Sequence, residues 1–477
     1  MFGFWQIFLA LVLGLGLAFL LSEILMKRKY PPKLPNGTMG WPFIGETLNL
    51  LKPHISTSIG SFMREHCSRY GKVFRSHLFG SPTIVSCDHD LNMFILQNED
   101  KLFQADYPKV MHDILGNFSL LILSSDSHKK QRNVVVNFVS SCKSSINFCN
   151  LAEKLAVSVL ESWKDCREVS FFREMKKFTL KLILKSLMGF EPERPLTLEM
   201  LEDFETYMRG FVSLPLDIPG SAYRKAVKAR ARLSSNVRKI VNERLNGSPH
   251  HDGKGDFLDE ILSNWRLSFQ EIASVILDIL LGGYETTSIL VSLIVYFLGH
   301  NPGALEKLKE EHESIREGKE KGKLLSWEDY QKMDYTRNVI LEGLRLGNVV
   351  KFLHRKALQD IKHKEYTIPA GWKVLPVLAG VHLDPVLHEN PSEFNPSRWS
   401  TDKATSKKLM SFGGGPRLCP GAELAKVETA LFLHHFVLSY RWKVRADDCP
   451  IAYPFVEFKR GLVLEIEPIQ AAEGKVD

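Results

Sequence analysis

A single cysteine stands in a short loop that is rich in glycine and proline, SFGGGPRLCPG at positions 411–421. Three consecutive glycines lose much conformational freedom on folding, so they are expected where a backbone turns sharply or lies close to a flat surface. An apolar segment with helical spacing, 422–431, follows Cys419 directly. Because the N-terminus of a helix carries a partial positive charge, this position favours the thiolate form of the cysteine. The loop therefore predicts a thiolate held close to a flat partner.

A second group of reactive side chains lies inside a long apolar segment, 268–302. Ser268 and Glu271 have the spacing of a capping box, which predicts that a helix begins there, and an Asn-Pro pair predicts its end. Apolar residues on every side indicate a helix that is buried or spans a membrane. Asp278 and Glu285 argue against a span, because an acid at the bilayer centre costs about 3 kcal/mol.

The middle of this predicted helix reads GGYETT, starting at Gly282. Two glycines inside a helix cost about 1 kcal/mol each relative to alanine, and they leave a groove without side chains. Glu285 and Thr286 stand beside that groove. Two interpretations remain open at this point. The glycines permit a tight helix crossing, with the hydroxyls bonded back to the preceding turn, or a planar group lies in the groove.

An acid and a base share one face of another predicted helix, since Glu342 and Arg345 are three residues apart in an apolar context. A lone pair of this kind contributes almost nothing when it is exposed. Arg398 follows in a proline-rich stretch and could share the same carboxylate. We therefore predict a buried, fully paired triad that stabilises the core below the cysteine loop.

The composition excludes several classes of protein. The chain has 477 residues, 44% of them hydrophobic, and a formal charge of +7, which is a mild excess over this length. No basic-aromatic motif of a nucleic-acid binder occurs, so no nucleic-acid partner is expected. The 7 cysteines are odd in number and irregularly spaced, without a CxxC pair, which argues against a disulfide framework or a zinc ribbon.

The N-terminal residues differ from the rest of the chain. From Phe2 to Met26 the sequence is almost wholly apolar, and Lys27–Lys29 form a basic cluster immediately after it. This length suffices to cross a bilayer, and the basic cluster is expected on the cytosolic side. A cleaved signal peptide is the alternative, but its charges would precede the apolar region. We expect a membrane anchor with its basic stop at 1–29, a proline-rich linker at 30–46 and a catalytic body at 47–477.

Helical patterns dominate the body between 91 and 301. A β-hairpin is expected over 73–87, with its turn at Gly80-Ser81-Pro82, and further strand patterns occur at 362–380 and 461–468. The fold class is therefore mainly α with a small β portion.

Taken together, these motifs resemble the cytochrome P450 family of haem-thiolate monooxygenases. The family signature F-x-x-G-x-R-x-C-x-G stands complete as Phe412, Gly415, Arg417, Cys419 and Gly421. The E-x-x-R pair, the aromatic-and-arginine stretch at 394–399 and the glycine-acid-threonine helix occur upstream in the family's order. The resemblance covers the chain from the anchor to near the C-terminus, and it implies the cytochrome P450 fold with one N-terminal transmembrane helix.

The resemblance assigns a cofactor and its ligands. It implies haem b with Cys419 as the axial thiolate ligand to iron, and it places Phe412 and Gly415 in the cofactor-binding loop. Arg417 and Arg355 are similar to the family's propionate-binding arginines. A tryptophan and an arginine four residues apart often serve the same purpose in the family, and here His128 and Arg132 occupy those positions. For His128 an ordinary surface histidine is the alternative.

The resemblance also assigns the oxygen chemistry and its electron source. Thr286 and Glu285 match the residues that deliver protons during O2 activation. The chain has no flavin or nicotinamide domain, so the resemblance implies electrons from an NADPH-dependent reductase in the endoplasmic reticulum membrane, with the catalytic domain in the cytosol. A group of lysines near the cysteine loop is a candidate docking surface for that reductase, with a solvated face as the alternative: Lys129, Lys130, Lys407, Lys408 and Lys426.

Within the family, the segments at 64–88 and 347–360 resemble the plant brassinosteroid branch, nearest to the dwarf-type steroid C-22 hydroxylases. The implied substrate is a sterol. Matching segments nominate an apolar substrate pocket from Met111, Ile114, Phe118, Phe211, Leu214, Val350, Phe352 and Phe455. Two alternatives remain: oxidation of another steroid position or of a triterpenoid or steroidal-saponin precursor, and a haem-thiolate isomerase, sensor or carrier that does not activate oxygen.

Overall fold

The computed structural model describes residues 33–41, 45–190, 195–211, 215–246, 256–320, 322–401, 407–453 and 455–469, and the single positions 14 and 213. The expected membrane anchor apart from position 14, residues 30–32 and 42–44 of the linker, and Leu214 lie outside the described residues.

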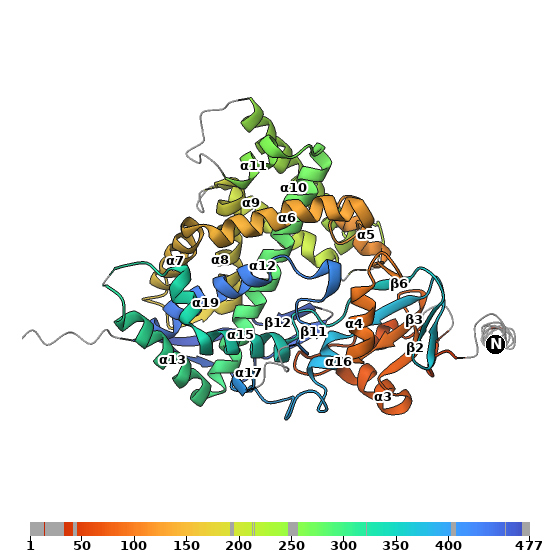
Figure 1. Cartoon of the computed structure of the whole chain (residues 1–477). Helices are drawn as coiled ribbons and strands as arrows, with labels where there is room; N and C mark the ends of the chain where they lie inside the picture. The colour runs from red at the N-terminus through yellow and green to blue at the C-terminus, as the bar shows by residue number, and fades with distance from the viewer. Residues whose placement is uncertain are drawn as a thin grey trace, which may run out of the picture.

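Helices form most of the described chain, as the hydrophobic periodicity predicts (Figure 1). The helices are α2 (Thr47–Leu50), α3 (Gly60–Tyr70), α4 (His89–Gln97), α5 (Lys109–Leu115), α6 (Ser125–Ser144), α7 (Ile146–Glu161), α8 (Phe171–Met188), α9 (Pro195–Gly210), α10 (Ala222–Leu245), α11 (Phe257–Asn264), α12 (Phe269–Gly299), α13 (Pro302–Glu317), α14 (Trp327–Lys332), α15 (Asp334–Gly347), α16 (Leu378–His382), α17 (Arg398–Thr401), the 3-10 turn η1 (Gly415–Arg417) and α19 (Ala422–Ser439).

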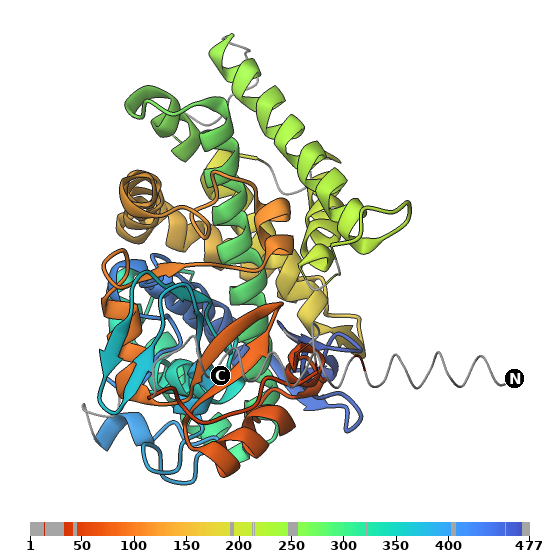
Figure 2. The same cartoon turned by 90° about the vertical axis from the view of Figure 1, so that its right-hand side faces the viewer.

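The long helix α12 passes through the middle of the molecule (Figures 1 and 2). Both hydrogen bonds of the predicted capping box are present, between Ser268 and Glu271. At the other end the Asn301 side chain donates to the Phe297 carbonyl at 2.6 Å, and Pro302 begins α13. In the described part of the chain, α12 is the one helix long and apolar enough to cross a membrane, but 67% of its apolar window is buried. The prediction of a buried helix is therefore confirmed, because α6, α8, α10, α15 and α19 pack around it.

The strands form small sheets at the edge of the helical body, the largest lying on one side of the molecule in Figure 1. The five-stranded sheet has the order β2 (Val73–Leu78), β3 (Ser81–Ser86), β9 (Lys373–Pro376), β6 (Arg355–Ala357), β4 (Phe103–Ala105). The three-stranded sheets are β1 (His54–Ile55), β11 (Pro450–Tyr453), β12 (Phe455–Phe458) and β10 (Tyr440–Val444), β13 (Val463–Pro468), β5 (Glu168–Ser170), and β7 (Ile361–His363) pairs with β8 (Tyr366–Ile368).

The predicted hairpin at 73–87 is present as β2 and β3, but its turn is earlier than expected. Phe79 and Gly80 occupy the turn with φ angles of 52° and 75°, while Ser81 and Pro82 already belong to β3. Two consecutive positive φ angles give the tight two-residue turn that matches the twist of paired strands. All seven cysteines are free thiols, which confirms the expectation of no disulfide framework.

Candidate active site

The loop that carries Cys419 is fixed by its own backbone. Its amide donates to the Phe412 carbonyl at 3.0 Å, and the amide of Leu418 donates to the Gly415 carbonyl at 3.0 Å. The loop then enters α19 at Ala422, as the sequence predicts. Cys419 itself is only partly buried.

The glycines of this loop serve two different purposes. Gly415 has φ of 63°, and a Cβ there would lie 2.0 Å from the Leu96 carbonyl oxygen at the end of α4. The close approach at Gly415 is therefore to protein backbone, which corrects the expectation that the whole loop lies flat against a partner. Gly413 has φ of 76° and meets only the tip of Leu353 at 3.9 Å. Gly413 thus leaves open space beside the cysteine.

The electrostatics of Cys419 also differ from the expectation. Burial raises the pKa of the thiol, although a backbone hydrogen bond with Gly421 and the charge of Arg132 lower it. Loss of water around the sulfur outweighs the helix terminus, because a thiolate is disfavoured wherever its hydration is removed. A cationic partner such as a metal ion is needed to hold this residue as thiolate.

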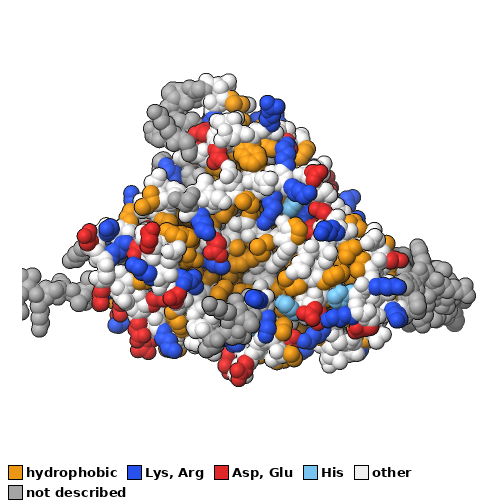
Figure 3. All heavy atoms as spheres, in the orientation of Figure 1, with side chains coloured by type: hydrophobic (Ala, Val, Ile, Leu, Met, Phe, Trp, Pro, Cys, Tyr) orange, Lys and Arg blue, Asp and Glu red, His pale blue; other side chains and the backbone are white. Residues whose placement is uncertain are grey.

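Two residues of α12 face open space although the helix is buried around them. Gly282 and Thr286 are exposed, and they lie on one face because they are four residues apart. Nothing lies within 4 Å of a Cβ placed on Gly282. The Thr286 hydroxyl donates to the Gly282 carbonyl, which leaves its oxygen free to accept. In Figure 3, hydrophobic side chains gather in the middle of the face shown.

The second glycine of the pair has the other role that the sequence left open. A Cβ on Gly283 would lie 2.2 Å from Cδ1 of Ile183 in α8. Gly283 therefore permits a tight crossing of α12 and α8, while Gly282 borders the open space. The tight-crossing interpretation of the GGYETT segment holds for Gly283, and Gly282 leaves the open space that a planar group would require.

Glu285 does not stand free beside Thr286. Its carboxylate forms an ion pair with Lys176 of α8 at 3.1 Å, and both side chains are about one-fifth exposed, 19% and 21%. The Lys176 ammonium also lies over the rings of Phe172 and Tyr284, at 4.7 and 5.6 Å. Sequence reasoning missed Lys176, because nothing in its own segment marks it.

Basic side chains converge from three distant segments. Arg417 donates to the carbonyls of Leu120, at 3.2 Å, and Leu123 in the loop between α5 and α6. Arg355 of β6 donates to the His354 carbonyl at 2.8 Å. The Nε atoms of both arginines face the Glu99 carboxylate at 2.6 Å each. Sequence reasoning did not single out Glu99.

His128 and Arg132 of α6 lie near Arg417 and Arg355. Arg132 donates to the Leu418 carbonyl at 2.6 Å, beside the cysteine. His128 is 2% exposed, so the surface-histidine alternative is wrong. Burial and the charges of Arg417 and Arg132 lower the pKa of His128 to about 4, so the ring is neutral at physiological pH.

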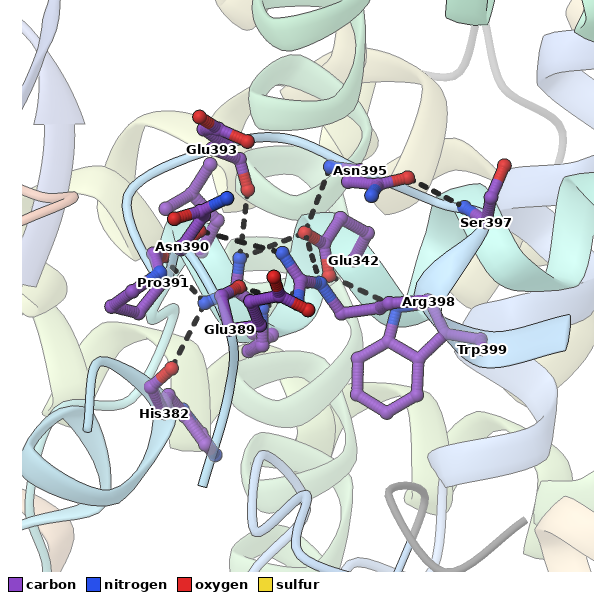
Figure 4. Close-up of polar contacts among 12 residues, drawn as sticks. Glu342, His382, Glu389, Asn390, Pro391, Glu393, Asn395, Ser397, Arg398 and Trp399 are labelled. Atoms are coloured by element: carbon purple, nitrogen blue, oxygen red, sulfur yellow. Dashed lines mark hydrogen bonds and ion pairs between the residues drawn. The ribbon is translucent and has the colours of Figure 1, made fainter. Parts of the chain in front are cut away.

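The predicted triad forms one buried cluster (Figure 4). The Glu342 carboxylate, 0% exposed, accepts from Nε and Nη2 of Arg345 at 2.9 and 2.7 Å and from Nε of Arg398 at 3.0 Å. Trp399 Nε1, at 3.0 Å, and the Asn395 amide, at 2.9 Å, complete its contacts. Backbone carbonyls in the 382–393 segment accept the remaining N–H groups of Arg345.

The nominated substrate residues that the structure describes fall into three groups. Ile114 is 0% exposed and lies beside Gly210 of α9, so the structure gives it a packing role. The rings of Phe211 and Phe455 meet edge-to-face at 6.5 Å, which brings α9 and β12 together. The other described residues of the set are accessible or partly buried: Met111, Phe118, Val350 and Phe352.

A polar contact that the sequence did not indicate fixes the loop after α5. Asp278 of α12 accepts from the Ser119 hydroxyl at 2.7 Å and from the Leu120 amide at 2.6 Å. Burial raises the pKa of Asp278 to about 7. The loop after α5 is thus tied to the helix face that carries Gly282, because Asp278 and Gly282 are four residues apart.

Three of the five lysines nominated for docking have acidic neighbours. Lys130 pairs with Glu271 at 2.7 Å, and Lys426 pairs with Glu423 at 2.7 Å. Lys129 pairs with Asp126 at 3.1 Å in an exposed position. The surface is therefore less basic than its lysines alone suggest.

A comparison with family models decides the identity of the fold. The model described as Cytochrome P450 matches residues 35–471. This chain belongs to the cytochrome P450 family. A solved structure titled "Retinoic acid bound cyanobacterial CYP120A1" superimposes with a TM-score of 0.81 at 26% identity, over 92% of this chain and 100% of that one. The monooxygenase fold expected from the sequence is confirmed.

The curated relatives are plant proteins that this chain covers over most of their length. "Cytochrome P450 724B1" of Oryza sativa subsp. japonica is 54% identical over 97% of both chains. "Cholesterol 22-monohydroxylase CYP90B52" of Paris polyphylla is 43% identical, over 94% of this chain and 97% of the relative. "Cholesterol 16,22-dihydroxylase CYP90G4" of Trigonella foenum-graecum is 42% identical, over 94% and 97%.

The family's haem fits the residues present. Cys419 is accessible, and Gly282 and Thr286 are exposed on one face of a buried helix. Among the described residues, Nη2 of Arg355 and the imidazole of His128 have no hydrogen-bond partner, so this guanidinium nitrogen and the one N–H of the neutral imidazole can donate to the haem carboxylates. Cys419 would hold the iron, and the bound haem would supply the binding and activation of O2.

Proposed function

We propose that this monooxygenase hydroxylates C-22 in the side chain of a sterol or steroid, as a step of brassinosteroid biosynthesis. The observation that carries the proposal is the 22-position in the printed names of relatives that are 42–43% identical over 94% of this chain. Met111 and Phe118, two of the apolar residues nominated for the substrate pocket, are only partly buried, which fits a substrate of this class. The reaction takes O2, two electrons and two protons, inserts one oxygen atom into a C–H bond and releases the other as water.

The chain's own residues deliver the protons. Thr286 presents its hydroxyl to the open space beside Gly282, one turn away on the same face. Glu285 is the next acid, and Lys176 holds it in place at 3.1 Å. In this proposal water near the Thr286 hydroxyl receives protons from Glu285, which regains them from solvent through its partly exposed side.

The electron source and the location belong to the same proposal. Residues 1–29 anchor the chain in the endoplasmic reticulum membrane in a single pass, 30–46 link it to the cytosolic domain at 47–477, and an NADPH-dependent reductase docks from the cytosol. Lys407 and Lys408, which form no ion pair with another described residue, are the basic residues best placed for that contact.

One alternative has an observation in its favour. A relative at 42% identity is named a cholesterol 16,22-dihydroxylase. Oxidation at a second ring position is therefore the second candidate function. Position on a rigid steroid depends on small displacements above the reacting centre, so close relatives can differ in it.

Product analysis tests the proposal. The full-length chain is expressed in microsomes with a plant reductase and NADPH, and cholesterol, campesterol, campestanol and several triterpenes are supplied. Mass spectrometry of a C-22 alcohol from the sterols supports the proposal. Oxygen at another carbon, or in triterpenes alone, would refute the C-22 assignment and leave the monooxygenase.

A variant pair tests the proton route in the same assay. Thr286→Ala is expected to keep the carbon monoxide spectrum of thiolate-bound haem and to lose most product, by about 100-fold or more. Thr287→Ala is the matched control, because Thr287 is buried at 2% exposure and lies off the open face. Equal turnover in the two variants would contradict this role of Thr286.

A further inference from the structure

Glu99 lies at the centre of the basic cluster, between the end of α4 and β4. Its side chain is 1% exposed. One carboxylate oxygen accepts from the Ala105 amide at 2.9 Å and from Nε of Arg417 at 2.6 Å. The other oxygen lies 2.6 Å from Nε of Arg355. A single buried carboxylate therefore joins two arginines that are far apart in the sequence.

This arrangement directs the rest of each guanidinium away from Glu99. An arginine has five N–H donors in a rigid plane. Arg417 uses three of them on Glu99, Leu120 and Leu123, and Arg355 uses one on His354 and faces Glu99 with another. Each arginine keeps at least two N–H groups for a further acceptor. Glu99 holds the inner Nε of Arg417 by a hydrogen bond and that of Arg355 by an ion-pair contact, so N–H groups on the outer Nη atoms remain for that acceptor.

The charges around the site are unbalanced without another acid. Three guanidiniums lie here, those of Arg132, Arg355 and Arg417, and His128 is neutral. Among the described residues, Glu99 is the one carboxylate in ion-pair contact with any of them. The neighbouring Asp100 accepts from the backbone amide of Ser125 instead. Glu99 pairs with Arg355 and Arg417, and Arg132 has no ion-pair partner among the described residues, so positive charge remains for the haem carboxylates.

We propose that Glu99 is a positioning residue of the haem site: it aims Arg355 and Arg417 at the haem carboxylates, and its charge contributes to the reduction potential of the iron. A carboxylate held in a buried site acts over several ångströms, because little water screens it. Reduction adds an electron to the haem, so a nearby negative charge disfavours it. A purely structural Glu99 would affect folding but would not change the potential through its charge.

Three variants of the full-length holoenzyme test this proposal. Glu99→Gln removes the charge with little change of shape, and Glu99→Asp keeps the charge but withdraws it by one methylene. Glu161→Gln makes the same chemical change on the surface, where the side chain is 61% exposed. Two quantities are measured: the ferric–ferrous midpoint potential by spectroelectrochemical titration, and the rate of haem transfer to apomyoglobin.

We expect Glu99→Gln to raise the midpoint potential and to lose haem about 10- to 100-fold faster, as loss of an outer-shell partner does at metal sites. Glu99→Asp should keep the potential near that of the wild type and lose haem faster, and Glu161→Gln should change neither quantity. A wild-type potential in haem-loaded Glu99→Gln would overturn the proposal. If that variant retains no haem, Glu99→Asp decides: faster haem transfer at an unchanged potential supports the proposal, and wild-type transfer overturns it.

Discussion

Removal of the Glu342 charge is expected to destabilise the protein severely. Glu342→Gln keeps the shape of the side chain but removes the carboxylate that pairs with Arg345 and Arg398, whose side chains are 0% and 10% exposed. The new amide nitrogen would also face guanidinium donors, so at least one of the five contacts is lost. Breaking a buried ion pair by removing one partner costs about 3–5 kcal/mol. That amount is a large part of the 5–15 kcal/mol by which typical domains are stable.

The structure indicates how to measure this cost. The triad joins α15 to the 382–399 segment, which leads into the cysteine loop, so the haem spectrum reports on it. We would titrate the holoenzyme with urea and follow the loss of the carbon monoxide complex of thiolate-bound haem. The urea concentration at the midpoint of unfolding should fall by the lost free energy divided by the slope of the unfolding free energy against urea concentration. Glu389→Gln is the matched control, because that side chain is exposed and contributes only its backbone carbonyl, to Arg398 at 2.9 Å.

A double-mutant cycle separates charge from shape. In an Arg398→Met background, Glu342→Gln should cost less, because the ion pair between Glu342 and Arg398 is already absent. If Glu342→Gln unfolded at the same urea midpoint as Glu389→Gln, the reasoning would be refuted. So would equal costs of Glu342→Gln with and without Arg398.

Three further predictions follow from the buried environment of α12 and α19. Gly283→Ala should destabilise the protein by about 1–3 kcal/mol through overpacking, because its Cβ would lie 2.2 Å from a side chain, and so lower the thermal midpoint of haem-absorbance loss. Gly282→Ala should leave that midpoint unchanged. Equal midpoints of the two variants would contradict the packing role of Gly283. Burial raises the pKa of Glu428 to about 8 from 4.5, so the stability contributed by its protonated form declines as pH rises from about 4.5 to about 8. Glu428→Gln should therefore be more stable than the wild type at pH 8 and lose that advantage near pH 4.5 in thermal unfolding, and a constant difference across pH would contradict the assignment. Asp278→Ala removes the two hydrogen bonds that hold the loop after α5. In steady-state turnover it should raise KM more than it lowers kcat. An unchanged KM would argue against a loop-holding role of Asp278.

Local features of the chain could be predicted from the sequence because they depend on neighbouring residues. The capping box at Ser268 sets the start of α12 with groups three residues apart, and the observed helix starts at Phe269. The β2–β3 hairpin follows from short-range strand patterns, although two positive φ angles, at Phe79 and Gly80, moved its turn. The cysteine signature of the family lies within a single loop, so it could be recognised without any tertiary information.

The tertiary structure alone decided which distant groups meet and what burial does to them. Glu99 and Arg417 are 318 positions apart and touch at 2.6 Å, and no local pattern marks a carboxylate as the partner of an arginine so remote. Lys176 reaches Glu285 only because α8 crosses α12 at Gly283. The thiol of Cys419 has a raised pKa because folding removes its water, although its sequence position next to a helix favours the thiolate. Periodicity and turn chemistry act over a few residues, whereas ion pairing and desolvation depend on the packed interior that the whole chain creates.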